Sequence, residues 1–150
     1  MEDGRATMIY KLDPTRGMIR TRAYVGQQLS LYCSAMGKLY LAYDMKDQLE
    51  EYWTSHKGEI TTLTQHTITK LPAMKKELLS IEQCGYAVDR EENELGICCI
   101  AAPIFDVMGR VQYAVSVSLT TAKLKQISEK TLATRVMETA RKISQELGGS

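Results

Sequence analysis

The second half of the chain alternates apolar runs with short polar breaks, and this pattern predicts strands. Residues 97–105 (Ile-Cys-Cys-Ile-Ala-Ala-Pro-Ile-Phe) form a continuous apolar run that is typical of a buried strand. A turn-forming segment, residues 106–109, separates this run from residues 111–119, so we predict a β-hairpin. Because Pro103 lacks a backbone N–H, we expect an edge or a bulge there. A short strand is also predicted over residues 86–89.

Several other stretches have apolar residues at helical spacing. Ser34 is a suitable N-cap for a helix that begins there, and Asp44 is a suitable cap for a second helix directly after it. A third helix is predicted from Pro72, which suits a first helical turn, to a stop at Gly85. Residues 120–147 carry an apolar stripe that predicts one or two further helices.

The N-terminal part has a different pattern. Residues 8–12 and 21–25 are predicted to form two strands, joined by the turn-rich residues 13–17. The Thr-rich residues 61–69 are interpreted as a loop or a short strand. Since strands and helices follow one another without regular β-α-β alternation, the predicted fold class is α+β, with an antiparallel sheet and helices on one or both faces.

Composition narrows the class of protein. The chain has 150 residues, a formal net charge of +1, 44% hydrophobic and 25% charged residues, which is typical of one globular domain. The near-neutral charge argues against direct binding of nucleic acid by this chain. There is no apolar stretch long enough for a membrane span and no secretory signal, so we expect a cytoplasmic protein without membrane contact.

The four cysteines, Cys33, Cys84, Cys98 and Cys99, contain no C-x-x-C spacing. The two histidines have no paired-ligand spacing around them either. We therefore interpret the cysteines as reduced thiols and expect neither a metal nor a cofactor.

Four features are candidates for ligand chemistry, and each also has a purely structural interpretation. The helix start at residues 34–38 offers free N–H groups that favour an anion, or it is only a cap. Ser116 and Ser118 face the same side of a strand, which is either the solvent face or the floor of a polar pocket. Asp89, before an acidic run, is part of a solvated loop or a pocket carboxylate. Cys99 on the partner strand is a small buried hydrophobe or a pocket-lining group.

Three longer motifs carry a resemblance to a known family. They are residues 31–42 (Leu-Tyr-Cys-Ser-Ala-Met-Gly-Lys-Leu-Tyr-Leu-Ala), residues 85–106, and residues 109–118 with Ala-Val-Ser-Val-Ser at the end. In this order and spacing they resemble the C-terminal effector-binding domain of the IclR family of bacterial transcriptional regulators, over essentially the whole chain. Within that family, residues 10–12 and 20–24 resemble the repressors of sugar-acid catabolism.

The resemblance implies a GAF-like fold, in which helices flank a curved antiparallel sheet, and a small carboxylate as the effector. It implies that the backbone amides of Ala35 and Met36 hold the effector carboxylate. Tyr32 replaces the smaller or His-containing residues common before this helix, and it is expected to narrow the pocket or contact the effector. The resemblance places further polar groups around the effector: Ser34, Asp89, Cys99, Ser116 and Ser118.

The resemblance also implies binding partners, and it implies that effector binding and DNA binding belong to separate domains. Residues 1–150 correspond to the effector domain, which assembles with copies of itself as a dimer or tetramer. The family's winged helix-turn-helix is absent from this chain, so DNA would be contacted only through that missing domain. We therefore predict the ligand-sensing domain of a repressor and not an enzyme. The alternatives are an oligomerisation module with a vestigial pocket, or an enzyme that acts on a keto acid through Cys99, for which no base is evident.

Overall fold

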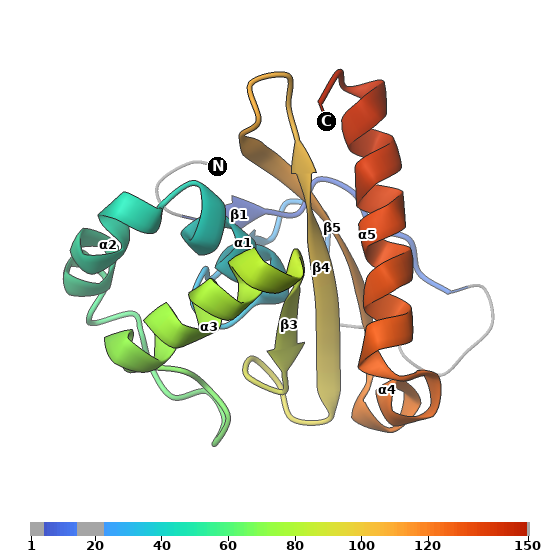
Figure 1. Cartoon of the computed structure of the whole chain (residues 1–150). Helices are drawn as coiled ribbons and strands as arrows, with labels where there is room; N and C mark the ends of the chain where they lie inside the picture. Colours follow the sequence, from blue (N-terminus) through green and yellow to red (C-terminus); the bar gives the residue numbers. More distant parts are fainter. Residues whose placement is uncertain (1–4, 15–22, 150) are drawn as a thin grey trace.

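The computed structural model describes residues 5–14 and 23–149, and a three-stranded antiparallel sheet forms its middle layer (Figure 1). The strands are β3 (Ala87–Arg90), β4 (Ile97–Phe105) and β5 (Val111–Thr120), in the order β3-β4-β5. The predicted hairpin is confirmed, since β4 and β5 pair directly. The α+β class, with helices that flank an antiparallel sheet, is confirmed as well.

Pro103 lies in the central strand, yet it meets both expectations. β3 pairs only with residues 98–101 of β4, so no strand of the described part of the chain borders Pro103 on that side. The register between β4 and β5 shifts at Ile104/Phe105, directly after the proline. Pro103, which has no backbone N–H, therefore lies next to the register shift and in a stretch of β4 that does not pair with β3.

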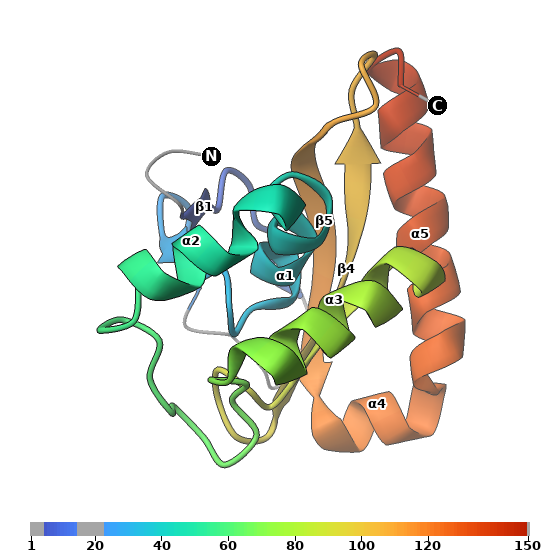
Figure 2. The ribbon, with the colours of Figure 1, turned by 60° about the vertical axis from the view of Figure 1, so that its left-hand side comes forward.

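Helices cover both faces of the sheet (Figures 1 and 2). On one face lie α1 (Ala35–Tyr43) and α3 (Leu71–Cys84), and on the other lie α4 (Thr121–Ile127) and α5 (Glu129–Glu146). The period of two along β4 divides its side chains between two hydrophobic clusters. Cys98, Ile100, Ala102 and Ile104 join the cluster of α5, and Ala101 and Phe105 join that of α1.

Three predicted helix boundaries are confirmed. Ser34 caps α1 and accepts a hydrogen bond from the N–H of Gly37 at 3.1 Å. α3 begins with a proline in its first turn and ends at Gly85, whose φ of 79° is the left-handed conformation that glycine adopts at low cost. The last helical stretch is interrupted at Ser128, which separates α4 from α5.

The predicted capping role of Asp44 is wrong. After α1 the chain passes through a 3-10 turn, η1 (Lys46–Gln48), into α2 (Leu49–Ser55), and neither has a side-chain cap. The Asp44 carboxylate instead accepts a hydrogen bond from the N–H of Val111 at 3.3 Å. It thereby links the end of α1 to the start of β5.

The two predicted N-terminal strands are also misplaced. Residues 8–12 contain no strand, and the antiparallel pair is formed by β1 (Ala6–Thr7) and β2 (Gln28–Leu29). The side chains of Ile9, Tyr10 and Leu12 are largely exposed, so the apolar pattern of this segment does not correspond to burial. Residues 15–22, which include part of both the predicted turn and the second predicted strand, lie outside the described residues.

Candidate functional site

A polar row crosses the sheet on the face that α1 covers. Asp89 of β3 pairs with Cys99 of β4, and Cys99 pairs with Ser118 of β5. The Cys99 thiol and the Ser118 hydroxyl are 3.1 Å apart. Ser116 lies two residues before Ser118 and therefore shares its face. Three strands thus bring four of the candidate residues side by side.

The N-terminus of α1 lies opposite this row, across a cavity of about 120 Å³ that both line. The first N–H groups of a helix have no intrahelical acceptor. The side chain and carbonyl of Ser34 serve Gly37 and Lys38, respectively. The N–H groups of Ala35 and Met36 are left without a capping acceptor, at the positive end of the helix dipole. This end of the cavity therefore favours an anion.

The rest of the cavity wall is acidic in one part and apolar in another. Asp89 and Glu94 contribute carboxylates, and none of the described residues that line it is a lysine, arginine or histidine. One part of the wall is apolar and comes from Met8, Ala23 and Leu29 of the N-terminal part and from Ile97. The lining residues are Met8, Ala23, Gln27, Leu29, Ser34, Ala35, Met36, Asp89, Asn93, Glu94, Ile97, Cys99, Ser116 and Ser118.

Tyr32 is the one candidate residue that the structure places outside this lining. Its side chain is buried with 3% exposure, and its hydroxyl donates to the carbonyl of Thr61 at 3.1 Å. The expectation that Tyr32 contacts the effector or narrows the pocket is therefore corrected. The turn before α1 directs this side chain into the core, where it fastens the loop that follows α2.

Asp89 is the most perturbed carboxyl group of the site. Burial, assisted by the charge of the nearby Glu92 carboxylate, raises its pKa from 3.8 to about 6. Opposing this, the N–H of Glu92 donates to Asp89 Oδ1 at 2.8 Å, and the charge of Lys38 lowers the pKa. At neutral pH Asp89 is thus mostly ionised. Because a buried charge is costly unless it is hydrogen-bonded, donors from a ligand would stabilise this carboxylate.

The Cys99 thiol has no sign of activation. Burial raises its pKa to about 11, and the hydrogen bond with Ser118 only partly opposes this. A nucleophilic cysteine needs a lowered pKa or an adjacent base. The neighbours of Cys99 supply neither, so its thiol acts as a small polarisable part of the wall.

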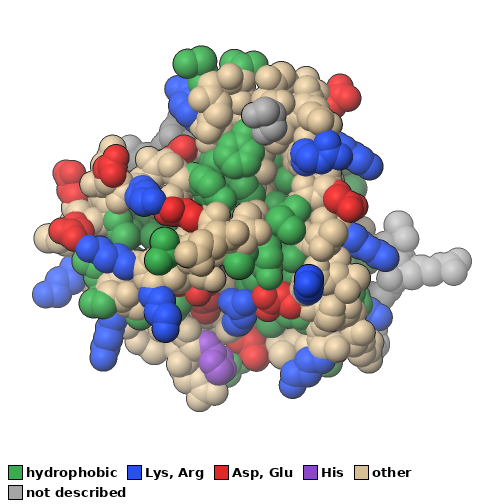
Figure 3. Space-filling model, in the orientation of Figure 1, with side chains coloured by type: hydrophobic (Ala, Val, Ile, Leu, Met, Phe, Trp, Pro, Cys, Tyr) green, Lys and Arg blue, Asp and Glu red, His purple; other side chains and the backbone are tan. Residues whose placement is uncertain are grey.

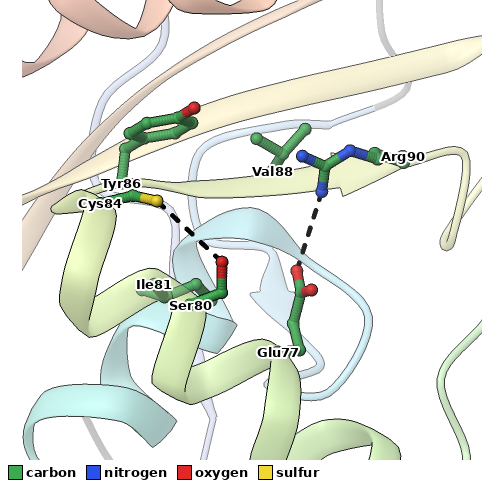
Figure 4. A pocket seen from close by; sticks show the side chains of 7 residues that line it. All are labelled: Glu77, Ser80, Ile81, Cys84, Tyr86, Val88 and Arg90. Carbon is green, nitrogen blue, oxygen red and sulfur yellow. Dashed lines mark hydrogen bonds and ion pairs between the residues drawn. The ribbon is translucent and has the colours of Figure 1, made fainter.

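A second cavity, of about 250 Å³, lies between α3 and β3 (Figure 4). Its polar groups bond one another, since Arg90 pairs with Glu77 at 3.9 Å and Ser80 lies 4.0 Å from Cys84. Arg90 also bonds Glu129 of α5 at 2.8 Å. Figure 3 shows hydrophobic side chains in the strip between α3 and α5, with opposite charges adjacent to one another below it. The polar groups of this second cavity therefore have fewer hydrogen bonds left to offer a ligand than those of the cavity at α1.

With this geometry in view, comparison with known proteins identifies the family. Residues 1–145 match the model of the bacterial transcriptional regulator IclR C-terminal family. The chain belongs to the IclR family of bacterial transcriptional regulators. The DNA-binding transcriptional repressor YiaJ of Escherichia coli is 59% identical over 98% of this chain and 52% of its own length. The expected similarity to a repressor is thereby confirmed.

Solved structures agree with this assignment. The crystal structure of a transcriptional regulator named YaiJ has a TM-score of 0.95 and 59% identity, and it covers 99% of this chain and 82% of that one. The Thermotoga maritima IclR structure has a TM-score of 0.84 and 35% identity, with coverage of 98% and 59%. These relatives are named as transcriptional regulators and not as enzymes.

The chain corresponds to only part of the length of its relatives. It spans about half the length of the curated relatives it matches. No helix in the described part is long and apolar enough to cross a membrane. Among residues 5–14 and 23–149, no cluster of three or more His, Cys, Asp or Glu side chains has the arrangement of a metal site.

Sequence reasoning missed several residues around the cavity. Asn93 and Glu94 belong to the polar segment after Asp89, in which the sequence singles out neither residue, and both line the cavity. Lys38, the last residue of the predicted helix start, is fully buried. Its position within the apolar run of residues 35–42 was a usable signal, because a lysine flanked by buried positions on a helix requires internal partners.

Proposed function

We propose that this chain is the effector-sensing domain of an IclR-family repressor, and that it binds a small hydroxylated organic acid in the cavity at α1. The effector carboxylate accepts hydrogen bonds from the N–H groups of Ala35 and Met36. What carries the proposal is the opposition of these open amides and the polar row Asp89–Cys99–Ser118, which runs from a buried to an exposed residue, across one cavity. Charge-assisted hydrogen bonds of this kind contribute about 1.5–3 kcal/mol each.

The far end of the cavity selects the rest of the effector. Asp89, when ionised, only accepts hydrogen bonds, whereas the hydroxyls of Ser116 and Ser118 both donate and accept. A second carboxylate there would face the charges of Asp89 and Glu94 without a basic side chain on the described wall. A monocarboxylate that carries hydroxyl groups, such as a sugar acid, therefore fits better than a dicarboxylate or a fatty acid.

The proposed output is a change in how copies of the domain are arranged. A ligand shifts such an equilibrium only if it binds one arrangement more tightly than the other. In the complete regulator, which acts in the cytoplasm, this shift would change the placement of a DNA-binding domain outside this chain. Support for this step comes from family membership and from the similarity to YiaJ, which is named as a DNA-binding transcriptional repressor.

We expect a thermal-denaturation screen to reveal the effector class. D-Gluconate and D-galacturonate represent hydroxylated acids, with D-glucose as the neutral control and butyrate as the acid without hydroxyls. An acid present at about 100 times its dissociation constant stabilises the folded state by about 2.7 kcal/mol. For a domain of this size that corresponds to a rise in Tm of several degrees.

The screen is extended to a broader set of sugar acids and 2-keto acids before a negative result is accepted. Light scattering with and without the active acid then reports the assembly. If no acid changes the melting temperature and assembly is indifferent to all of them, the chain is an oligomerisation module and the sensing proposal fails.

A further inference from the structure

Lys38 occupies an unusual position at the centre of the molecule. It lies in the second turn of α1, and its side chain has 0% exposure. It is the only buried lysine or arginine among the residues that the structure describes. Removing an ammonium group from water is costly unless it is paired and fully hydrogen-bonded. The partners of Lys38 therefore indicate what this charge is used for.

Three acceptors surround the Lys38 ammonium group. It donates to Glu92 Oε1 at 2.6 Å, to the carbonyl of Val88 at 2.6 Å and to Glu77 Oε1 at 2.8 Å. An ammonium group has three donors, so all of them are used. The three acceptors come from β3, from the segment after β3 and from α3. One side chain thus joins α1, which carries the amides of the cavity, to three other parts of the fold.

The segment held in this way carries the acidic wall of the cavity. The N–H of Glu92 donates to Asp89 Oδ1, and the next two residues, Asn93 and Glu94, line the cavity. Its first residue, Glu91, has a φ of 58°, a conformation that costs energy for a residue other than glycine. The segment therefore needs fixed partners if it is to keep this shape.

The Lys38 ammonium group also balances charge. Glu92 and Asp89 are both buried, and Glu77 lies close by with 22% side-chain exposure. Glu92 Oε2 has no hydrogen-bond partner, so the pairing of its other oxygen with Lys38 is its main compensation. Without the ammonium charge, the Glu92 side chain would be driven toward water. It would then pull on residues 91–96 against the hydrogen bonds that Thr64 and Thr67 donate to the carbonyls of Glu91 and Glu92.

We propose that Lys38 is a positioning residue of the effector site, which sets the placement of residues 91–96 relative to the amides of Ala35 and Met36. The inference rests on the proposed function for its consequence in effector binding, but the placement itself is a property of the unliganded protein. Lys38 does not line the cavity, so it acts through its contacts with Glu92 and with the Val88 carbonyl beside Asp89.

The test uses a variant that avoids an unpaired buried charge. Lys38→Met combined with Glu92→Gln removes both charges of the pair and retains similar side-chain volumes. The matched control is Lys46→Met, which removes an ion pair of similar length, Lys46 with Glu82 at 2.7 Å, at an exposed site. Should the double variant fail to unfold cooperatively, Glu92→Gln alone takes its place, with a smaller expected effect of about threefold.

The first readout is amide hydrogen exchange of the unliganded protein. We expect protection at Glu92 and Asn93 to fall at least tenfold in the double variant, while protection in the β4–β5 hairpin is unchanged. The Lys46→Met control should alter neither. Unchanged protection at residues 92–93, or an equal fall throughout the domain, would overturn the proposal, because a merely stabilising lysine has no local effect of this kind.

The second readout is the affinity for D-gluconate, or for the acid of the screen that shifts the wild-type melt most. We expect at least a tenfold loss in the double variant and none in the control. Wild-type affinity in the double variant would contradict the positioning role. If the wild-type protein binds no acid at all, the proposed function fails, and hydrogen exchange alone decides the role of Lys38.

Discussion

Replacing Gly37 by alanine is expected to lower the free energy of unfolding by about 4 kcal/mol or more, a large part of the stability of a domain this size. A Cβ at Gly37 would lie 2.4 Å from the Cα and 2.6 Å from the carbonyl oxygen of Leu31, and 2.7 Å from the carbonyl oxygen of Ser30. All three atoms belong to the backbone, so no side chain can move aside. The turn over residues 30–34 would have to separate from α1, and the cavity would lose its anion-binding end.

Gly58 supplies the matched control for this substitution. A Cβ at Gly58 meets no heavy atom within 4 Å, so Gly58→Ala should change stability by less than about 1 kcal/mol. Urea unfolding of both variants, followed by circular dichroism, gives the comparison. Equal stability of Gly37→Ala and Gly58→Ala would show that α1 does not lie this close to residues 30–31.

Replacing Asp89 by asparagine is expected to stabilise the unliganded domain and to weaken effector binding. Burial raises the pKa of Asp89 to about 6 in the folded state, against an ordinary value of 3.8 for an aspartate. The folded state therefore binds protons more readily than the unfolded one, and ionisation of Asp89 costs roughly 2–3 kcal/mol of stability at neutral pH. Asparagine removes this cost and still accepts the hydrogen bond from the N–H of Glu92.

The pH dependence identifies the cause of this gain. Wild-type stability should fall as the pH rises from about 4 to about 6 by this contribution, which Asp89→Asn lacks. The variant should therefore be no more stable than wild type near pH 4, and it should reach its full gain in stability above pH 6. Asp106→Asn is the control, because hydrogen bonds from its own turn lower the pKa of Asp106, and its loss should not stabilise. A pH-independent gain for Asp89→Asn would contradict this explanation.

The same substitution tests the role of Asp89 in binding. An amide cannot supply the charge that strengthens hydrogen bonds from effector hydroxyls, so affinity for a hydroxylated acid should fall roughly tenfold to a hundredfold. Isothermal titration of the active acid measures the loss. A stabilised variant that binds as tightly as wild type would place the effector away from β3. The substitution is thus expected to raise stability and to lower affinity. These opposite effects indicate that the Asp89 carboxylate serves effector binding and not folding.

The strands and helices of the second half could be predicted because their signals are local. The apolar run of β4 and the turn after it determine the hairpin, and the hairpin register then fixes which side chains share a face. Ser116, Ser118 and Cys99 were therefore identifiable as neighbours. The caps at Ser34 and Gly85 follow from the same local chemistry.

The remaining features depend on tertiary contacts that local patterns do not encode. Ile9 and Tyr10 suggest a buried strand, but no layer of the described structure covers them. Tyr32 is adjacent to the site in sequence, yet its hydroxyl is held by Thr61, which lies far along the chain. Lys38 finds its partners on β3, α3 and the 91–96 segment, and only the fold brings these together.

If the effector carboxylate lies on the N–H groups at the start of α1, Ala35→Pro should weaken its binding. Proline is well tolerated at the first helical position, and Ser34 before it already has the extended conformation that a following proline requires. The variant thus removes one N–H with little cost to the helix, and Ala35→Gly, which keeps the N–H, is its control.

Titration calorimetry with the acid found in the screen should show a loss of about tenfold to a hundredfold in affinity for Ala35→Pro, as expected for one charge-assisted hydrogen bond. Ala35→Gly should bind within a fewfold of wild type. Wild-type affinity in Ala35→Pro would contradict the account and place the carboxylate elsewhere.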